Sequence, residues 1–393
     1  ITSFRQNVSA NDGKLIVVFP IVNWDFRWQR PQQLLTRIRD DGYAVLYPAM
    51  TLTPVSGGEF SKSAALDLIA LNELEPSITQ VWLNSSDPIN IYTDAIEGQD
   101  LTQISAGLSA LLEEAQAREI VFLVQFPSWY PVAKNLHKKF KSKIVFDCMD
   151  NHAGFSTNTG KAIETEELLA IEADLVTVSS LALYDEYSPK NSNVVLVKNG
   201  TEYEHFEAAT SNGVISKISD GMIIGYYGAI SDWFDADLVH YCASRQPDWT
   251  FILIGSTTGC DISSLSDLPN VHFLGEINYQ KLPEFLVDFD VAIIPFKLNP
   301  LTNATNPVKF YEYISAGKPV VATLLPELLP YDKYCYLSET KKDFLDQLHK
   351  AIHEVDREKK IEQRQSLGQS NSWDVRSETM LHHFRCLWSE DEN

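Results

Sequence analysis

The stretch Asn303-Ala-Thr-Asn-Pro-Val-Lys-Phe-Tyr-Glu-Tyr-Ile-Ser-Ala-Gly-Lys-Pro-Val-Val321 reads as a loop, a helix, a turn and a strand. Asn306 is a suitable N-cap for a helix whose first residue is Pro307, because the missing N–H of proline is not needed at that position. Gly317 then ends the helix, and Pro319 prevents the helix from resuming. This order of elements predicts a helix that leads into a strand of an α/β fold.

Two charged side chains on the predicted helix suggest a ligand. Lys309 lies in the first turn, where free N–H groups and the helix dipole favour a phosphate. Glu312 follows on the same face, about 4.5 Å further along the axis. In this order along the helix, the lysine cation would pair with a diphosphate and the carboxylate would accept hydrogen bonds from the adjoining ribose. An ordinary Lys/Glu pair on the surface of an amphipathic helix explains the spacing equally well.

Length and composition limit the class of protein. A chain of 393 residues suits two domains, and its 44% hydrophobic and 22% charged residues are typical of a folded soluble protein. The net charge of −21 disfavours binding to nucleic acid. Five scattered cysteines without a C-x-x-C pair favour reduced thiols and argue against disulfides and a zinc site.

The location that we expect is the cytoplasm. The sequence has no apolar run long enough to span a membrane and no charged-then-apolar signal at its start. The basic segment His137-Lys-Lys-Phe-Lys-Ser-Lys143 allows at most a peripheral contact with the inner face of the membrane, and it suits the solvated end of a helix better.

Short apolar runs alternate with helical segments along the chain, a pattern typical of βαβ units and doubly wound parallel sheets. The predicted strands are 15–20, 43–47, 80–83, 120–124, 144–146, 175–178, 194–197, 222–227, 250–254, 271–274, 291–294 and 319–323. The pattern restarts after a polar segment, so we predict one domain over 1–205, a second over 206–370, and a C-terminal helix over 371–393 that packs back toward the first. Ligands of such folds bind at the carboxyl ends of the strands, in a cleft between the domains. The loop after the first strand, 21–30, has no glycine, so NAD is not expected as a cofactor.

Motifs in both halves of the chain resemble the GT-B glycosyltransferases, and most closely the family-4-type retaining enzymes of bacterial surface-polysaccharide and teichuronic-acid-type synthesis. The motifs are Trp24-Asp-Phe-Arg-Trp-Gln-Arg-Pro-Gln-Gln33, Asp147-Cys-Met-Asp150, Lys198-Asn-Gly200, Gly225-Tyr-Tyr-Gly-Ala-Ile230, Phe251-Ile-Leu-Ile-Gly255, Asp290-Val-Ala-Ile-Ile-Pro-Phe296 and 306–321. The resemblance implies two Rossmann-like domains that face a cleft, followed by C-terminal helices. It also implies a metal-independent hexosyltransferase that moves a sugar from a nucleoside-diphosphate sugar to a saccharide or lipid-linked saccharide. No cofactor besides the donor substrate is expected.

The resemblance assigns residues to the donor site. Lys309 and the helix start at Asn306 would hold the diphosphate, and Glu312 would hold the ribose hydroxyls. A second glutamate of the family falls on Ala304 here, so Asn303, Thr302 and Thr305 are the candidates to replace its contact with the donor sugar. The other expected donor contacts are Gly228, Ala229, Gly255 and Thr257.

The first domain is expected to supply the acceptor side. Asp150 and His152 follow a predicted strand, where the resemblance places groups near the reacting carbon; capping or loop hydrogen bonds explain them equally well. Arg30 is a candidate cation for the diphosphate. A metal held by Asp147, Asp150 and His152 is disfavoured, because enzymes of this kind need none. The expected acceptor contacts are Trp24, Asp25, Arg27 and Trp28, although the aromatic rings would also suit a core.

Two other functions fit the same fold. A nucleotide-sugar 2-epimerase would need no acceptor. A non-catalytic protein that binds a sugar or nucleotide is compatible with the loss of the glutamate at Ala304. The donor base, the sugar, the linkage and the oligomeric state are not predicted.

Overall fold

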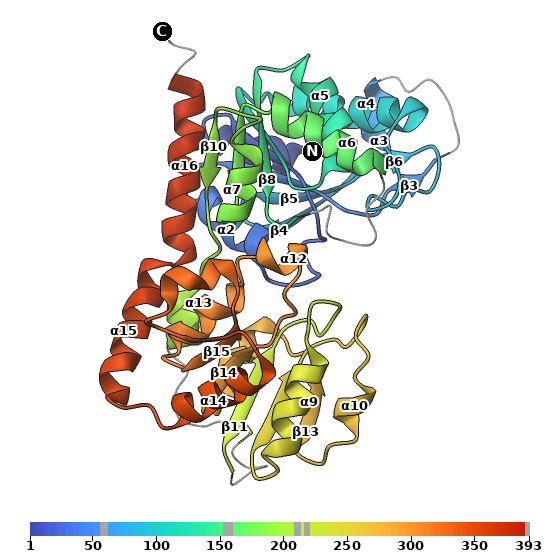
Figure 1. The fold of residues 1–393 in the computed structure, drawn as a ribbon. Helices are drawn as coiled ribbons and strands as arrows, with labels where there is room; N and C mark the ends of the chain where they lie inside the picture. The colour runs from blue at the N-terminus through green and yellow to red at the C-terminus, as the bar shows by residue number, and fades with distance from the viewer. Residues whose placement is uncertain (56–61, 152–159, 208–213, 216–220, 390–393) are drawn as a thin grey trace. The chain divides into compact units, whose positions relative to one another are not determined.

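The computed structural model describes residues 1–55, 62–151, 160–207, 214–215 and 221–389 (Figure 1). Its contacts divide the chain into two compact units: unit 1 comprises Ile1–Val197 and Ser377–Asn393, and unit 2 comprises Lys198–Arg376. The chain therefore leaves unit 1 after Val197 and returns after Arg376, whereas we expected boundaries at 205 and 370. Within the described ranges, no helix combines the length and apolar character needed to cross a membrane.

Unit 1 is built on a sheet with the strand order β10-β9-β8-β7-β1-β2-β5-β4, in which only the β4–β5 pair is antiparallel. Strand β1 is apolar and buried on both faces, as expected for the centre of a parallel sheet. The strands are β1 Lys14–Phe19, β2 Ala44–Pro48, β4 Ala70–Glu75, β5 Ile78–Trp82, β7 Glu119–Val124, β8 Ser142–Cys148, β9 Leu175–Val178 and β10 Val194–Leu196, with a small pair of β3 Thr53–Pro54 and β6 Asn84–Ser85. We did not predict β4, because its sequence, rich in Glu and Asn, has low strand propensity.

Helices connect these strands. They are α1 Thr2–Ala10, α2 Arg30–Asp40, α3 Lys62–Asp67, α4 Gly98–Ala115, the 3-10 helix η1 Pro127–Trp129, α5 Tyr130–His137, α6 Gly160–Glu172 and α7 Leu181–Tyr187. The last helix, α16 Trp373–Ser389, begins in unit 2 and ends in unit 1. Within unit 1, Arg385 of this helix forms an ion pair with Asp41.

Unit 2 has a sheet with the order β13-β12-β11-β14-β15-β16, and all of its strand pairs are parallel. Its strands are β11 Ile223–Tyr227, β12 Thr250–Ile254, β13 Val271–Gly275, β14 Val291–Ile294, β15 Val320–Thr323 and β16 Tyr336–Ser338. Its helices are α8 Tyr203–Glu207, α9 Ala236–Arg245, α10 Ser263–Ser266, η3 Tyr279–Lys281, α11 Leu282–Leu286, α12 Pro300–Asn303, α13 Val308–Ser315, η4 Pro326–Tyr331, α14 Lys341–Ile352 and α15 Arg357–Ser370. The prediction of two doubly wound parallel sheets is confirmed.

Each sheet has a topological switch point, where the chain leaves adjacent parallel strands in opposite directions. In unit 1 it lies between β1 and β7, and in unit 2 it lies between β11 and β14. Ligands of open α/β sheets bind outside the carboxyl ends of the strands at such points. The loops after β1, β11 and β14 are therefore the places to look for a site.

Candidate active site

Two glycines bring together the backbone loops that follow β11 and β12, on one side of the unit 2 switch point. Gly228 follows β11 with a φ of +134°, and Gly255 follows β12 with a φ of +145°. A Cβ atom at Gly255 would lie 1.9 Å from the carbonyl oxygen of Gly228. The loops are also joined by hydrogen bonds from the Gly228 amide to the Ile254 carbonyl (2.9 Å) and from the Ile230 amide to the Ser256 carbonyl (2.8 Å). The backbone of Gly228 therefore leaves no room for a side chain at Gly255.

Lys309 lies directly over this glycine turn. A Cβ atom at Gly228 would lie 1.9 Å from Lys309 Cε and 2.6 Å from Lys309 Nζ. The ammonium is also 5.8 Å from the ring centroids of both Tyr226 and Phe296. Lys309 belongs to the first turn of α13, so its charge adds to the positive end of the helix dipole beside the partly exposed Gly228. This arrangement can hold an anion at the carboxyl end of β11.

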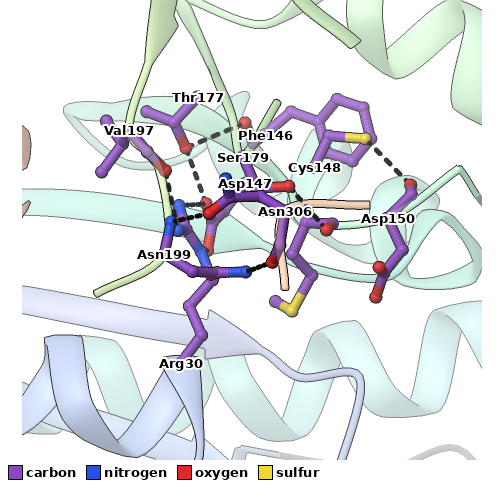
Figure 2. A network of polar contacts seen from close by, with 11 residues as sticks. Arg30, Phe146, Asp147, Cys148, Asp150, Thr177, Ser179, Val197, Asn199 and Asn306 are labelled. Carbon is purple, nitrogen blue, oxygen red and sulfur yellow. Dashed lines mark hydrogen bonds and ion pairs between the residues drawn. The ribbon is translucent and has the colours of Figure 1, made fainter. Parts of the chain in front are cut away.

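The prediction that Asn306 caps this helix is wrong. Helix α13 begins at Val308, and its N-cap is Pro307. The buried Asn306 side chain instead accepts a hydrogen bond from the Asn199 amide (2.9 Å) and donates to Glu327 (3.0 Å) and Tyr311 (3.1 Å). Figure 2 shows its contact with Asn199. Asn306 therefore holds the segment before α13 in place, and its amide is not directed to an anion.

Glu327 extends this buried network. Its carboxylate also pairs with Lys198 at 2.9 Å. The carbonyl of Asn306 accepts from Asn199 Nδ2 (2.7 Å), and the carbonyl of Asn199 accepts from Arg376 (3.0 Å). The Lys198-Asn-Gly200 motif is thus a buried structural link in unit 2. Glu327 was missed, because it is distant from Lys198 in sequence and no local pattern marks the pair.

Glu312 lies one turn beyond Lys309 and is nearly fully buried. Burial raises the pKa of this carboxyl to about 7, and the nearby Glu202 carboxylate acts in the same direction. Tyr227 and the Lys309 ammonium oppose this rise in pKa. Glu312 therefore changes its charge near neutral pH. Its ionised form can accept hydrogen bonds from two neighbouring hydroxyls, as a ribose would offer.

The segment before α13 contains the residues considered as replacements for the missing glutamate. Thr302 is the N3 residue of a capping box at the start of α12, and its hydroxyl donates to the Lys297 carbonyl (2.5 Å). The Thr305 hydroxyl donates to the Leu301 carbonyl (2.9 Å). Ala304 is buried, and Asn303 is exposed at the end of α12. Of the three candidates, Asn303 has the most exposed side chain, whereas Thr305 is partly exposed and Thr302 is buried.

The other predicted donor contacts lie on the two joined loops. The Ala229 carbonyl accepts a hydrogen bond from the Tyr226 hydroxyl (2.8 Å), which fixes the turn after Gly228. Thr257 follows Gly255 and is partly exposed. The structure thus brings Gly228, Ala229, Gly255 and Lys309 to one edge of the sheet.

Arg30 does not act as the available cation that we predicted. It is buried in unit 1, where Nη2 pairs with Asp147 Oδ1 at 2.8 Å and Nη1 donates to the Val197 carbonyl at 2.8 Å (Figure 2). Thr177 donates to the same Asp147 oxygen at 2.8 Å. The ion pair joins α2 to β8 and fixes the last residue of unit 1 before the chain crosses. The sequence could not show this, because Arg30 and Asp147 lie in distant segments.

The other catalytic candidates of unit 1 lie at the end of β8. Asp150 is partly exposed, and its carbonyl accepts a hydrogen bond from the Cys148 thiol (3.4 Å). His152 lies outside the described residues. Among the residues that the structure describes, no three His, Cys, Asp or Glu side chains are grouped so as to hold a metal ion.

The aromatic loop after β1 divides between core and surface. Trp24 is buried, with its ring against Trp28 (centroids 5.9 Å apart) and Tyr47 (5.3 Å). Asp25 is exposed, and Arg27 is partly exposed with its guanidinium 4.6 Å from the Phe26 ring centroid. Phe26 itself is 56% exposed. Trp24 is therefore a core residue, and the chain from Asp25 to Trp28 faces solvent in whole or in part.

Comparisons with known proteins relate this chain to glycosyltransferases. Residues 228–355 match the family described as glycosyl transferases group 1. The chain is also 30% identical over 293 residues to TuaH of Bacillus subtilis, which is named a putative teichuronic acid biosynthesis glycosyltransferase. This match covers 68% of the chain and 73% of TuaH. The chain belongs to the group 1 glycosyltransferases.

Solved structures place this glycosyltransferase in the GT-B fold. Sucrose-phosphate synthase from Thermosynechococcus elongatus matches with a TM-score of 0.72 at 14% identity, over 96% of this chain and 100% of that one. Anabaena HepE, solved in complex with UDP and glucose, matches with a TM-score of 0.65 at 14% identity, over 95% of this chain and 99% of HepE. At such low identity the likeness shows the fold alone. The activity of the glycosyltransferase rests on its family.

Proposed function

We propose that this enzyme transfers a sugar from a nucleoside-diphosphate sugar, bound by unit 2, to a saccharide or lipid-linked saccharide acceptor, bound by unit 1. The observation that carries the donor assignment is the position of Lys309 over Gly228, with Glu312 one turn further along α13. The cation and the open backbone suit the diphosphate, and the buried carboxylate suits the ribose. The likeness to HepE, which was solved with UDP-glucose, makes UDP-sugars the first donors to test.

The proposed reaction retains the anomeric configuration. The bond between the anomeric carbon and the phosphate oxygen breaks, and a bond from the acceptor oxygen to the same face of that carbon forms. The departing phosphate takes the proton of the acceptor hydroxyl, so no protein nucleophile is needed. Charge builds up on the leaving diphosphate in the transition state, where a preorganised cation such as Lys309 stabilises it most.

The proposed product is a surface polysaccharide or its precursor. This assignment is supported by the relation to TuaH, whose name refers to teichuronic acid biosynthesis. A peripheral contact with the inner face of the membrane would use the exposed lysines after α5, Lys138, Lys139 and Lys141. Co-sedimentation of the protein with anionic vesicles, lost when these lysines are changed to Ser, tests that contact.

The proposed function is tested in two steps. A thermal-shift screen against nucleoside diphosphates and their sugars identifies the donor, because a ligand that binds the folded state raises its melting temperature. The donor is then incubated with alkyl glycosides, and the glycoside product and its anomeric configuration are read by NMR. A product with inverted configuration contradicts the retaining mechanism. Consumption of the donor without a glycoside product, or binding without turnover, contradicts sugar transfer.

A further inference from the structure

The loop Pro20–Trp24, which follows β1 at the switch point of unit 1, accepts a hydrogen bond at every one of its backbone carbonyls. Each of six consecutive carbonyls from Phe19 to Trp24 accepts one. The donors are the Gln125 amide (2.9 Å), Trp129 Nε1 (3.1 Å), the Tyr92 hydroxyl (2.6 Å), the Tyr47 hydroxyl (2.6 Å), the Phe26 amide (3.2 Å) and Gln32 Nε2 (2.8 Å), in that order along the loop. The Asn23 side chain is fixed as well, because it accepts from the Met50 amide at 2.9 Å.

Apart from the Phe26 amide, which closes a local turn on Asn23, these donors come from segments spread over the first 130 residues. The loop is therefore ordered mainly by contacts with other parts of unit 1. A loop without glycine that lacked such contacts would retain backbone freedom worth about 1–2 kcal/mol per residue. Folding has already removed this freedom. A ligand that binds to the end of the loop therefore meets side chains that are already in place.

The fixed loop leads directly into the exposed chain from Asp25 to Arg27. It stands at the carboxyl end of β1, beside β7, which is the ligand-binding edge of such a sheet. We propose that Pro20–Trp24 is a preorganised frame that positions Asp25, Phe26 and Arg27 for the acceptor saccharide, and that Tyr92 is a positioning residue of this frame. This inference rests on the proposed function, because it takes the acceptor to bind unit 1.

Tyr92 is the member of the frame that can be tested most cleanly. Its side chain is 40% exposed, and its ring packs edge-on against Phe126 with centroids 5.5 Å apart. The variant Tyr92→Phe keeps that packing and removes one hydroxyl, and water can replace the hydroxyl at the Ile21 carbonyl. The same change at the buried Tyr47 would leave the Val22 carbonyl without a partner and would lower stability as well.

Tyr92→Phe is compared with the wild type and with Tyr336→Phe, which loses a hydroxyl hydrogen bond of similar length (2.7 Å, to Glu354) in unit 2. The assay uses octyl glucoside, octyl N-acetylglucosaminide and octyl glucuronide as acceptor probes, and the donor found by thermal shift. We expect Tyr92→Phe to raise the KM for the glycoside 3- to 10-fold, with the donor KM, the acceptor-free hydrolysis of donor and the melting temperature unchanged. An unchanged glycoside KM, or an equal rise in both KM values, overturns the proposal.

Hydrogen exchange of the amides of residues 21–28 is a second test of the positioning role, and it needs no acceptor. We expect faster exchange in Tyr92→Phe and wild-type exchange in Tyr336→Phe. Wild-type exchange in Tyr92→Phe overturns the positioning role whatever the kinetics. The proposed function fails if the wild type neither binds a nucleotide sugar nor transfers a sugar. That outcome is measured on the wild type alone, so it is distinct from a failure of the Tyr92 proposal.

Discussion

The Lys309 side chain occupies the space that a side chain at Gly228 would need, with Lys309 Cε 1.9 Å from the position of a Cβ atom there. A cation therefore lies against the Gly228 backbone at the carboxyl end of β11. The two residues form one feature, since a change at either alters the position or the charge of the same anion site.

Gly228→Ala is expected to displace Lys309 and to lower turnover at least 10-fold. The φ of +134° adds backbone strain of about 1–3 kcal/mol. Gly42→Ala is the matched control, because Gly42 also has a positive φ (+90°) but nothing within 4 Å of its Cβ position. Equal loss of activity in the two variants would mean that strain alone explains the effect. Steady-state kinetics and circular dichroism separate these outcomes.

Lys309→Ala is expected to lower kcat about 10²- to 10³-fold, as for the loss of other preorganised charges that stabilise a transition state. The melting temperature should change little, because the side chain is only partly buried. Lys341→Ala, at an exposed lysine of α14, controls for the loss of one positive charge. Wild-type turnover in Lys309→Ala would remove this lysine from the mechanism.

Glu312→Gln is expected to stabilise the protein at high pH. The pKa of Glu312 is about 7 in the folded state against an ordinary value of 4.5, so between these pH values the folded chain keeps a proton that the unfolded chain has released. The stability of the wild type therefore falls as pH rises through this window, by about 3 kcal/mol in total. Glutamine cannot ionise, so the stability of the variant should not fall with pH for this reason.

Thermal unfolding at pH 5 and pH 8 measures this difference. The two proteins should melt alike at pH 5, and the variant should melt higher at pH 8. Glu339→Gln, at an exposed position, should give the same small difference at both values. The donor KM of the wild type should also fall as pH rises through 7, because the carboxylate is the form that accepts ribose hydroxyls. A pH-independent donor KM would argue against that contact.

Asn306→Ala is expected to destabilise unit 2 by about 2–3 kcal/mol. It leaves the Asn199 amide and one hydrogen bond of Glu327 without a partner in a buried position. Asn303→Ala, three residues earlier and exposed, should change stability by less than about 0.5 kcal/mol. Chemical denaturation of both variants provides the test. Equal stabilities would show that the buried network contributes little.

Arg30→Met is expected to destabilise unit 1 by about 3–5 kcal/mol, because it leaves the Asp147 carboxylate buried without its cation. The double variant Arg30→Met/Asp147→Leu should recover part of this loss. A stable Arg30→Met protein that is impaired only in turnover would restore the catalytic role that we first assigned to Arg30. Urea unfolding and kinetics on both variants decide between the roles.

Local sequence determined much of the fold. Apolar runs such as 15–20 and 250–254 marked buried strands, and Gly317, with its φ of +71°, ended α13 where expected. These signals are local: burial on both faces requires a continuous apolar run, and a left-handed turn requires glycine. The positions of Lys309 and Glu312 on one helix follow from the same local periodicity.

The roles of polar residues were less predictable, and Asn306 and Arg30 show why. Their types and positions suit an anion site, yet each is held by a partner more than 100 residues away in sequence, Asn199 and Asp147 respectively. Tyr92 is a similar case, since its hydroxyl meets the Ile21 carbonyl 71 residues away. A side chain alone does not reveal which distant group will satisfy it.

The sequence by itself determined the alternation of strands and helices, the identity of the α13 helix and the charges on it, because these depend on local periodicity and on the residues that begin and end each element. Only the tertiary structure decided where each of these charges lies and which groups surround it. Buried polar groups must be paired, and pairing depends on which distant segments the sheet topology brings together. Lys309 lies over the open backbone at Gly228, whereas Arg30 and Asn306 are committed to the interior.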